Sequence, residues 1–95
     1  MPAYLVAIGS VKDPAAYEEY RKLAGPAIRQ YDGRFLARGG ESHVLEGSFP
    51  GPRVVVVEFP NVARAKEFFD SPEYQAARRK RLAVADLNLI VVEGA

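Results

Sequence analysis

Short apolar runs rich in β-branched residues occur at three places in the chain. They predict strands over residues 4–9, 53–59 and 87–93, and polar or turn-forming residues end each of them. Because the run at 53–59 contains four consecutive valines, it is too continuously apolar to have one face in water. The chain therefore begins with a strand, ends with a strand, and has a third apolar strand between them.

A fourth strand is predicted before the central valine run. Residues 34–40 and 42–47 have strand-like patterns, and the paired glycines at 39–40 are typical of a bulge or bend. The simplest interpretation is one bent strand. The Pro- and Gly-rich segment that follows predicts a hairpin turn, and the spacing places Glu46 opposite or nearly opposite Arg53.

Apolar residues at three- and four-residue spacing predict a long first helix. Asp13-Pro14 is a helix start, because the carboxylate can accept from free N–H groups while proline tolerates the first turn. Pro26 cannot donate to the carbonyl four residues earlier, so we expect a kink or a restart there. Gly33 is expected to end the helix as a residue free to adopt the left-handed conformation.

Two shorter helices are predicted between the central and the last strand. Asn61 should cap the first and Ser71 the second, which is expected to run from about Glu73 to Ala85 with Leu82 on its buried side. The order of elements is then β-α-β-β-α-α-β. This order predicts an α+β, ferredoxin-like split βαβ fold with an antiparallel sheet and a second helix broken in two.

The predicted sheet is apolar on both of its faces. In one strand, Val54 and Val56 point to one face of the sheet and Val55 and Val57 to the other. The other strands show the same pattern. Helices on one side cannot cover both faces, and monomers rarely expose so large an apolar patch. We therefore expect a homodimer with the two sheets packed face to face. The alternative is a monomer whose first helix or termini fold over the second face.

Length and composition limit the possible functions. The chain has 95 residues, enough for one domain over 1–95, and its 13 Lys and Arg against 12 Asp and Glu give a net charge of +1. A net charge this small produces no strong electrostatic field that would attract nucleic acid or an anionic membrane surface. We expect neither partner. The basic run at 78–81 is expected to be solvated, with nucleic-acid association as a weaker hypothesis. The absence of cysteine and of a signal-like or membrane-spanning segment favours a cytoplasmic location.

Several motifs together resemble the DUF1330 family of the dimeric α+β barrel superfamily. The resemblance covers nearly the whole chain, with one departure at Asp32, where the family pattern usually has glycine. It implies a ferredoxin-like fold paired through its sheets and brings no established reaction. Related families on this architecture include cofactor-free monooxygenases, muconolactone-type isomerases and stress-responsive barrel proteins. The segments that carry the resemblance are Asp13-Pro14, Tyr17, Tyr20-Arg21, Gly33-Arg34-Phe35-Leu36, Arg38-Gly39-Gly40, Glu46-Gly47, Glu58-Phe59-Pro60, Ser71-Pro72-Glu73-Tyr74 and Arg81.

A small ligand pocket is expected at the boundary between helices and sheet. Its candidate lining residues are Tyr20, Arg38, His43, Tyr74 and Arg81. Arg38 adjoins the predicted bulge, which could aim its guanidinium at an anion; the alternative is an arginine paired with a neighbouring acid. His43 is the only imidazole and could act as a general acid or base, or could be an ordinary strand histidine. A tyrosine stripe at helical spacing usually belongs to the core with its hydroxyls reaching an edge, and a pocket lined by Tyr20 and Tyr74 is the alternative.

The sequence leaves two classes of function open. One is a cofactor-free enzyme, of the isomerase or monooxygenase type, in which Arg38 holds a carboxylate or oxyanion and His43 or a tyrosine moves the proton. The other is a ligand-binding or assembly protein without turnover. No cofactor and no metal site are expected, because a single histidine and no cysteine cannot form the usual ligand sets. No catalytic residue is assigned.

Overall fold

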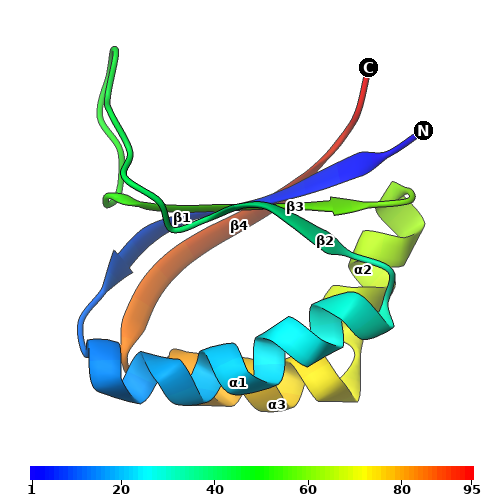
Figure 1. Ribbon diagram of the computed structural model, residues 1–95, viewed down its shortest axis with the longest axis horizontal. Coiled ribbons are helices and arrows are strands. Elements are labelled where there is room, and N and C mark those ends of the chain that lie inside the picture. The colour runs from blue at the N-terminus through cyan, green and yellow to red at the C-terminus, as the bar shows by residue number, and fades with distance from the viewer.

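The computed structural model describes all residues of the chain, 1–95, and has four strands and three helices (Figure 1). The fold is the predicted α+β, ferredoxin-like one, with two consecutive helices between the third and fourth strands. Its elements are β1 (Ala3–Val11), α1 (Pro14–Gln30), β2 (Arg34–Arg38), β3 (Arg53–Phe59), α2 (Val62–Asp70), α3 (Pro72–Arg81) and β4 (Ala85–Glu93). None of the helices combines the length and apolar character needed to cross a bilayer.

The four strands form one antiparallel sheet in the order β2-β3-β1-β4. Leu5 at the centre of β1 pairs with Val57 on one side and Val91 on the other, so these three side chains point toward the same face. Helices α1 and α3 pack side by side beneath that face (Figure 1). The core fills the space between, and its largest fully buried side chains are Tyr74, Phe59, Phe68 and Val57.

All three predicted helix starts are confirmed. The Asp13 side chain accepts from the N–H of Ala16, and Asn61 accepts from that of Arg64. Ser71 has two roles, because its hydroxyl donates to the Phe68 carbonyl that ends α2 and accepts from the Tyr74 N–H that begins α3. The break between α2 and α3 is thus held by one buried serine.

The first helix differs from the prediction at two positions. It is continuous from Pro14 to Gln30 with Pro26 inside it, so no restart occurs there. The left-handed residue after the helix is Asp32, with φ of 66°, and not Gly33. Aspartate tolerates this conformation better than most residues. Gly33 is needed for a different reason: a Cβ there would lie 2.7 Å from a methyl group of Ile28.

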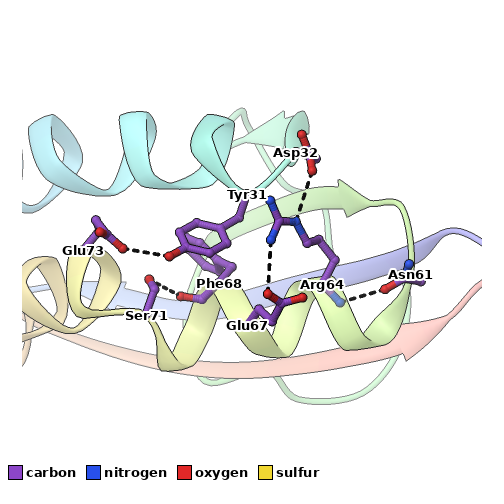
Figure 2. Close-up of polar contacts among 8 residues, drawn as sticks. All are labelled: Tyr31, Asp32, Asn61, Arg64, Glu67, Phe68, Ser71 and Glu73. Carbon is purple, nitrogen blue, oxygen red and sulfur yellow. Dashed lines mark hydrogen bonds and ion pairs between the residues drawn. The ribbon is translucent and has the colours of Figure 1, made fainter.

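The end of α1 is tied to α2 and α3 by polar contacts (Figure 2). The Tyr31 hydroxyl donates to Glu73 over 2.9 Å. Arg64 lies over the Tyr31 ring, at 4.8 Å from its centroid, and donates to Asp32 over 3.1 Å. It also contacts Glu67 one helical turn on. These contacts fix one end of the helical layer, where the three helices meet.

Two predictions about the second half of the chain are wrong in detail. Helix α3 ends at Arg81, whereas we expected it to reach Ala85, which instead begins β4. Leu82 is exposed and does not face the core. The four basic residues that end the helix interact favourably with its dipole, and a tight turn follows at once.

The predicted bent strand is also wrong. Strand β2 ends at Arg38, which pairs with Val55, and residues 39–52 form an extended connection that we call the arm. Glu46 lies on the arm and does not pair with Arg53, which faces Gly9 of β1. The chain leaves the sheet after Arg38 because Gly39 adopts a positive φ of 73°, which redirects it before a ladder can continue.

The face of the sheet away from the helices, which we call the open face, is apolar, as predicted. No element of the chain covers it (Figure 1). Three of its large side chains are exposed: Leu36, Ile90 and Val92. Glu58 also lies on this face, where Arg34 of the neighbouring strand donates to it over 2.7 Å. The monomeric alternative, in which α1 or the termini fold over this face, is not what the chain does.

Candidate functional site

Two cavities lie between the helices and the sheet, and they share one apolar wall. The inner cavity, of about 40 Å³, lies between α1 and the sheet. The outer cleft, of about 390 Å³, lies between β4 and helices α2 and α3. Leu5, Leu87 and Leu89 border both. The outer cleft has the size of a small-ligand site, whereas the inner cavity has room only for a few water molecules.

A pair of tyrosines lines the inner cavity. The hydroxyl oxygens of Tyr20 on α1 and Tyr74 on α3 lie 3.1 Å apart, and their rings meet edge to face. Burial raises the pKa of the Tyr20 hydroxyl far above its ordinary range, and the neighbouring Tyr74 raises it further. Tyr20 is therefore protonated at neutral pH, which makes it a hydrogen-bond donor and not a base.

Three arginines also line the inner cavity, and no acidic residue does. Arg53 donates to the Tyr17 hydroxyl over 3.2 Å and lies over that ring. Arg38 lies over the ring of Phe35, with 4.1 Å between the guanidinium carbon and the ring centroid. Neither arginine forms an ion pair, whereas Arg21 pairs with an acid of its own helix. The mouth of this cavity is thus positively charged and can attract an anion.

Arg81, the last residue of α3, is a buried cation without an acidic partner. Only 5% of its surface is exposed, and its Nε has no hydrogen-bond partner. Its guanidinium carbon lies 5.7 Å from the Tyr20 ring centroid, and it lines the outer cleft. An arginine cannot lose its proton to escape the cost of burial. An unpaired buried guanidinium at a cleft is therefore a candidate anion-binding group.

The remaining lining of the outer cleft is mostly apolar, and its charges are mainly positive. Lys66 and Arg78 join Arg81 there, with Asp70 as the single acid. This combination suits a ligand with an apolar body and a negative group. The chain has no group of three or more His, Cys, Asp or Glu side chains close enough to hold a metal ion.

The structure brings together four of the five residues that the sequence suggested. Tyr20, Arg38 and Tyr74 line the inner cavity, and Arg81 lies over Tyr20. His43 is separate, because it lies on the arm and is exposed, with Glu41 of the arm 3.5 Å from its Nε2. The bent-strand interpretation had placed it near the sheet, and the arm carries it away.

Arg53 was missed as a site residue. The sequence pattern could have predicted its position, because strand alternation places Arg53 on the same face as Val55 and Val57 and so toward the helices. The expected pairing with Glu46 had assigned it a surface partner. Arg21 was missed as well, since its position on the edge of the helical stripe gives no sign that it reaches the cavity.

The comparisons with known proteins agree on family and fold. The family model for the domain of unknown function DUF1330 matches residues 2–95. The chain belongs to the DUF1330 family. No curated protein is similar enough in sequence to count as a relative. The identification rests on nearly the full length of the chain, and it agrees with the motifs quoted above.

Solved structures of several proteins share this fold. A protein of unknown function from Rhodopseudomonas palustris has a TM-score of 0.77 at 23% identity, over 99% of this chain and 82% of its own. A dimeric ferredoxin-like protein of unknown function from Bacteroides fragilis has a TM-score of 0.64 at 11% identity, over 98% of this chain and 96% of its own. SnoaB, a cofactor-independent oxygenase from Streptomyces nogalater, has a TM-score of 0.66 at 10% identity, over 99% and 92%. At these identities the likeness shows the fold alone.

Proposed function

We propose that this DUF1330 protein binds a small, partly apolar anion between its helices and sheet, and that it does so as a homodimer. The observation that carries the binding proposal is Arg81, which is buried at the outer cleft and forms no ion pair with an acid of the protein. The planar guanidinium can bind a carboxylate through two parallel hydrogen bonds. A bound anion would compensate the charge that folding buries.

The rest of the lining supports the same kind of ligand. An apolar body would lie along Leu87 and Leu89, which border both cavities. Tyr20, protonated and hydrogen-bonded to Tyr74, supplies a donor at the inner end. Lys66 and Arg78, which line the outer cleft with Arg81, would attract the anion from solution.

Titration calorimetry with carboxylates and matched neutral compounds tests the binding proposal. We expect benzoate and 4-phenylbutyrate to bind more tightly than benzamide and 4-phenylbutanol. Arg81→Met should weaken carboxylate binding roughly tenfold or more, since a charge-assisted bidentate contact is lost. Arg79→Met, an exposed position two residues earlier on the same helix, is the matched control. Carboxylates that do not bind, or that bind Arg81→Met as well as the wild type, would overturn the proposal.

The open face supports the homodimer. Its exposed Leu36, Ile90 and Val92 form part of a continuous apolar surface that water would contact in a monomer. Proteins of this fold from Bacteroides fragilis and Jannaschia are described as dimeric. Sedimentation at micromolar concentration should give the mass of two chains, and Ile90→Asp should give one. A wild-type protein that sediments as a single chain contradicts the dimer and leaves the ligand proposal standing.

Cofactor-free catalysis is a second candidate, favoured by the tyrosine pair. The neutral Tyr20 hydroxyl and the Arg81 guanidinium, which lies over the Tyr20 ring, can together stabilise an enolate or another oxyanion that develops on the ligand. SnoaB, which shares the fold, is a cofactor-independent oxygenase. Proton exchange at the α-carbon of a bound carboxylate, followed by NMR in deuterated water, distinguishes the two functions. Exchange that Tyr20→Phe slows while binding persists would support catalysis, and its absence across the panel would leave binding alone.

A further inference from the structure

The arm is much longer than a hairpin connection requires. Residues 39–52 contain no helix or strand, and they rise on the side of the sheet away from the helices (Figure 1). Two neighbouring antiparallel strands need a connection of only about two to five residues. Connections of this length without secondary structure are uncommon in compact domains, and those that are ordered are usually functional. We therefore expect the arm to have a function beyond joining β2 to β3.

The arm carries large apolar side chains that contact little of their own chain. Val44 and Phe49 are both more than half exposed, and Leu45 is 96% exposed. The acidic residues of the arm are Glu41, before Val44, and Glu46, directly after Leu45. A projecting segment that presents three large apolar residues to water is typical of a surface that is covered in the functional assembly.

The apolar side of the arm is continuous with the open face. A hollow of about 650 Å³ is lined by arm residues from Ser42 to Pro52, with Val44, Leu45 and Phe49 as the large apolar ones, and on the sheet side by Val54. Val54 pairs with Ile8, and both point away from the helices. Whatever covers the open face therefore also meets the inner side of the arm.

The dimensions of a sheet sandwich place a second copy beside the arm. Packed sheets lie about 10 Å apart. Half of the arm, about seven residues in each direction, can reach up to roughly 23 Å when extended. The arm rises from the open face, so its tip would pass the plane of a partner sheet packed there. It would then lie against the end of that sheet and not stop short of it.

We propose that the arm of each subunit clasps a second copy of this chain, with Val44, Leu45 and Phe49 packed against the ends of the partner's terminal strands. The inference rests on the proposed homodimer and adds a second contact to it. In Figure 1 the two chain termini rise on the same side of the sheet as the arm but at its opposite end. A two-fold axis between the sheets can therefore bring each arm to the terminal end of the other copy.

Two observations favour that arrangement over arm-to-arm contact. Glu41 and Glu46 give the arms like charge, which disfavours their meeting at one end. The terminal strand ends offer exposed apolar side chains instead, with Met1 68% and Val92 51% exposed. Each arm then covers apolar surface that the flat packing of the sheets alone would leave at the edge.

Photo-crosslinking tests the contact directly. The chain has no cysteine, so Leu45→Cys labelled with benzophenone maleimide carries the only probe. Mixed with isotope-labelled protein, it should crosslink between copies to residues 1–4 or 90–95. Lys80→Cys, on the exposed side of α3, is the control and should give no crosslink between copies. Crosslinks from Cys at position 45 to the partner's arm, or none at all, would overturn the proposal.

The strength of the dimer provides a second test. Leu45→Asp should raise the dissociation constant of the dimer roughly tenfold or more, because it removes a buried leucine from the interface. Leu23→Asp makes the same change on the helical layer and should leave the dissociation constant of the dimer unchanged. If the wild type and Leu45→Asp dimerise equally while Ile90→Asp does not, the clasp is wrong and the homodimer stands. A monomeric wild type overturns both, and benzoate binding remains as the separate readout of the ligand site.

Discussion

The hydroxyl oxygens of Tyr20 and Tyr74 lie 3.1 Å apart and join α1 to α3 within the helical layer. The two residues are 54 positions apart in sequence, and each comes from the apolar stripe of its own helix. Because Tyr74 is fully buried, its hydroxyl has no access to bulk water. The pair is therefore both part of the core and the polar end of the inner cavity.

Stability should fall at high pH because Tyr20 is buried as the neutral phenol. Its pKa is raised in the folded state above the ordinary value of about 10. The contribution is fully present below pH 10 and is lost as pH rises above it, by up to about 1.4 kcal/mol per pH unit. Tyr20→Phe should flatten this decline in urea unfolding measured from pH 8 to 11.

Part of the alkaline decline should remain in Tyr20→Phe. Hydrogen bonds to Glu58 and Glu73 raise the pKa of Tyr4 and Tyr31 respectively, so these phenols also favour the protonated folded state. A variant whose unfolding free energy declines with pH as steeply as that of the wild type would contradict the role given to Tyr20.

Substitutions at two adjacent positions of the turn after α1 should affect stability to different extents. Gly33→Ala should destabilise the fold by about 1–3 kcal/mol, because a Cβ would lie 2.7 Å from Ile28 and 2.8 Å from the Phe59 ring. Asp32→Gly should change stability by less than about 1 kcal/mol, since glycine removes the strain of a positive φ while the exposed contact with Arg64 is lost. Thermal unfolding of both variants checks the difference. Equal effects would show that packing at Gly33 is not what the turn requires.

The caps of the two short helices should differ in importance. Asn61→Ala removes one accepted hydrogen bond at an exposed helix start and should cost about 1 kcal/mol. Ser71→Ala removes two buried ones, and about 2 kcal/mol is expected. Asn61→Ser and Ser71→Thr keep a capping oxygen and serve as controls. Chemical denaturation measures all four, and a Ser71→Ala effect no larger than that of Asn61→Ala would contradict the double role.

The local signals at the helix starts were read correctly from this sequence, and the extent of strand pairing was not. Helix starts at Asp13, Asn61 and Ser71 depend on a few neighbouring atoms, and all three were correct. The bent strand failed because residues 42–47 have a strand-like pattern but no partner strand within reach. Pairing of β2 with β3 ends at Arg38, and a residue pattern does not reveal where a ladder ends.

The same limit applied to the site. Helical spacing placed Tyr20 and Tyr74 on inward faces, and the structure brings them together. His43 was placed near them only because residues 42–47 were predicted to form a strand. Those residues belong to the arm instead, so His43 does not line the cavity. Arg53 was overlooked because an incorrect register gave it a partner. The errors at His43 and Arg53 thus followed from one error in strand pairing, whereas Arg21 was missed on the helix.

Arg81 gives a prediction in which stability and binding change in opposite directions. Replacing buried charge by an apolar side chain of similar volume is often neutral or stabilising, by up to about 4 kcal/mol. Arg81 has no acidic partner, so Arg81→Met should raise the free energy of unfolding of the ligand-free protein by about 1–2 kcal/mol while it removes carboxylate binding. A structural arginine would behave differently, because its loss would destabilise the protein. Urea unfolding of Arg81→Met and of the exposed control Arg79→Met, each with and without benzoate, distinguishes a ligand-binding role of Arg81 from a structural one. Destabilisation of Arg81→Met by more than that of the control would assign Arg81 to the core and away from a ligand.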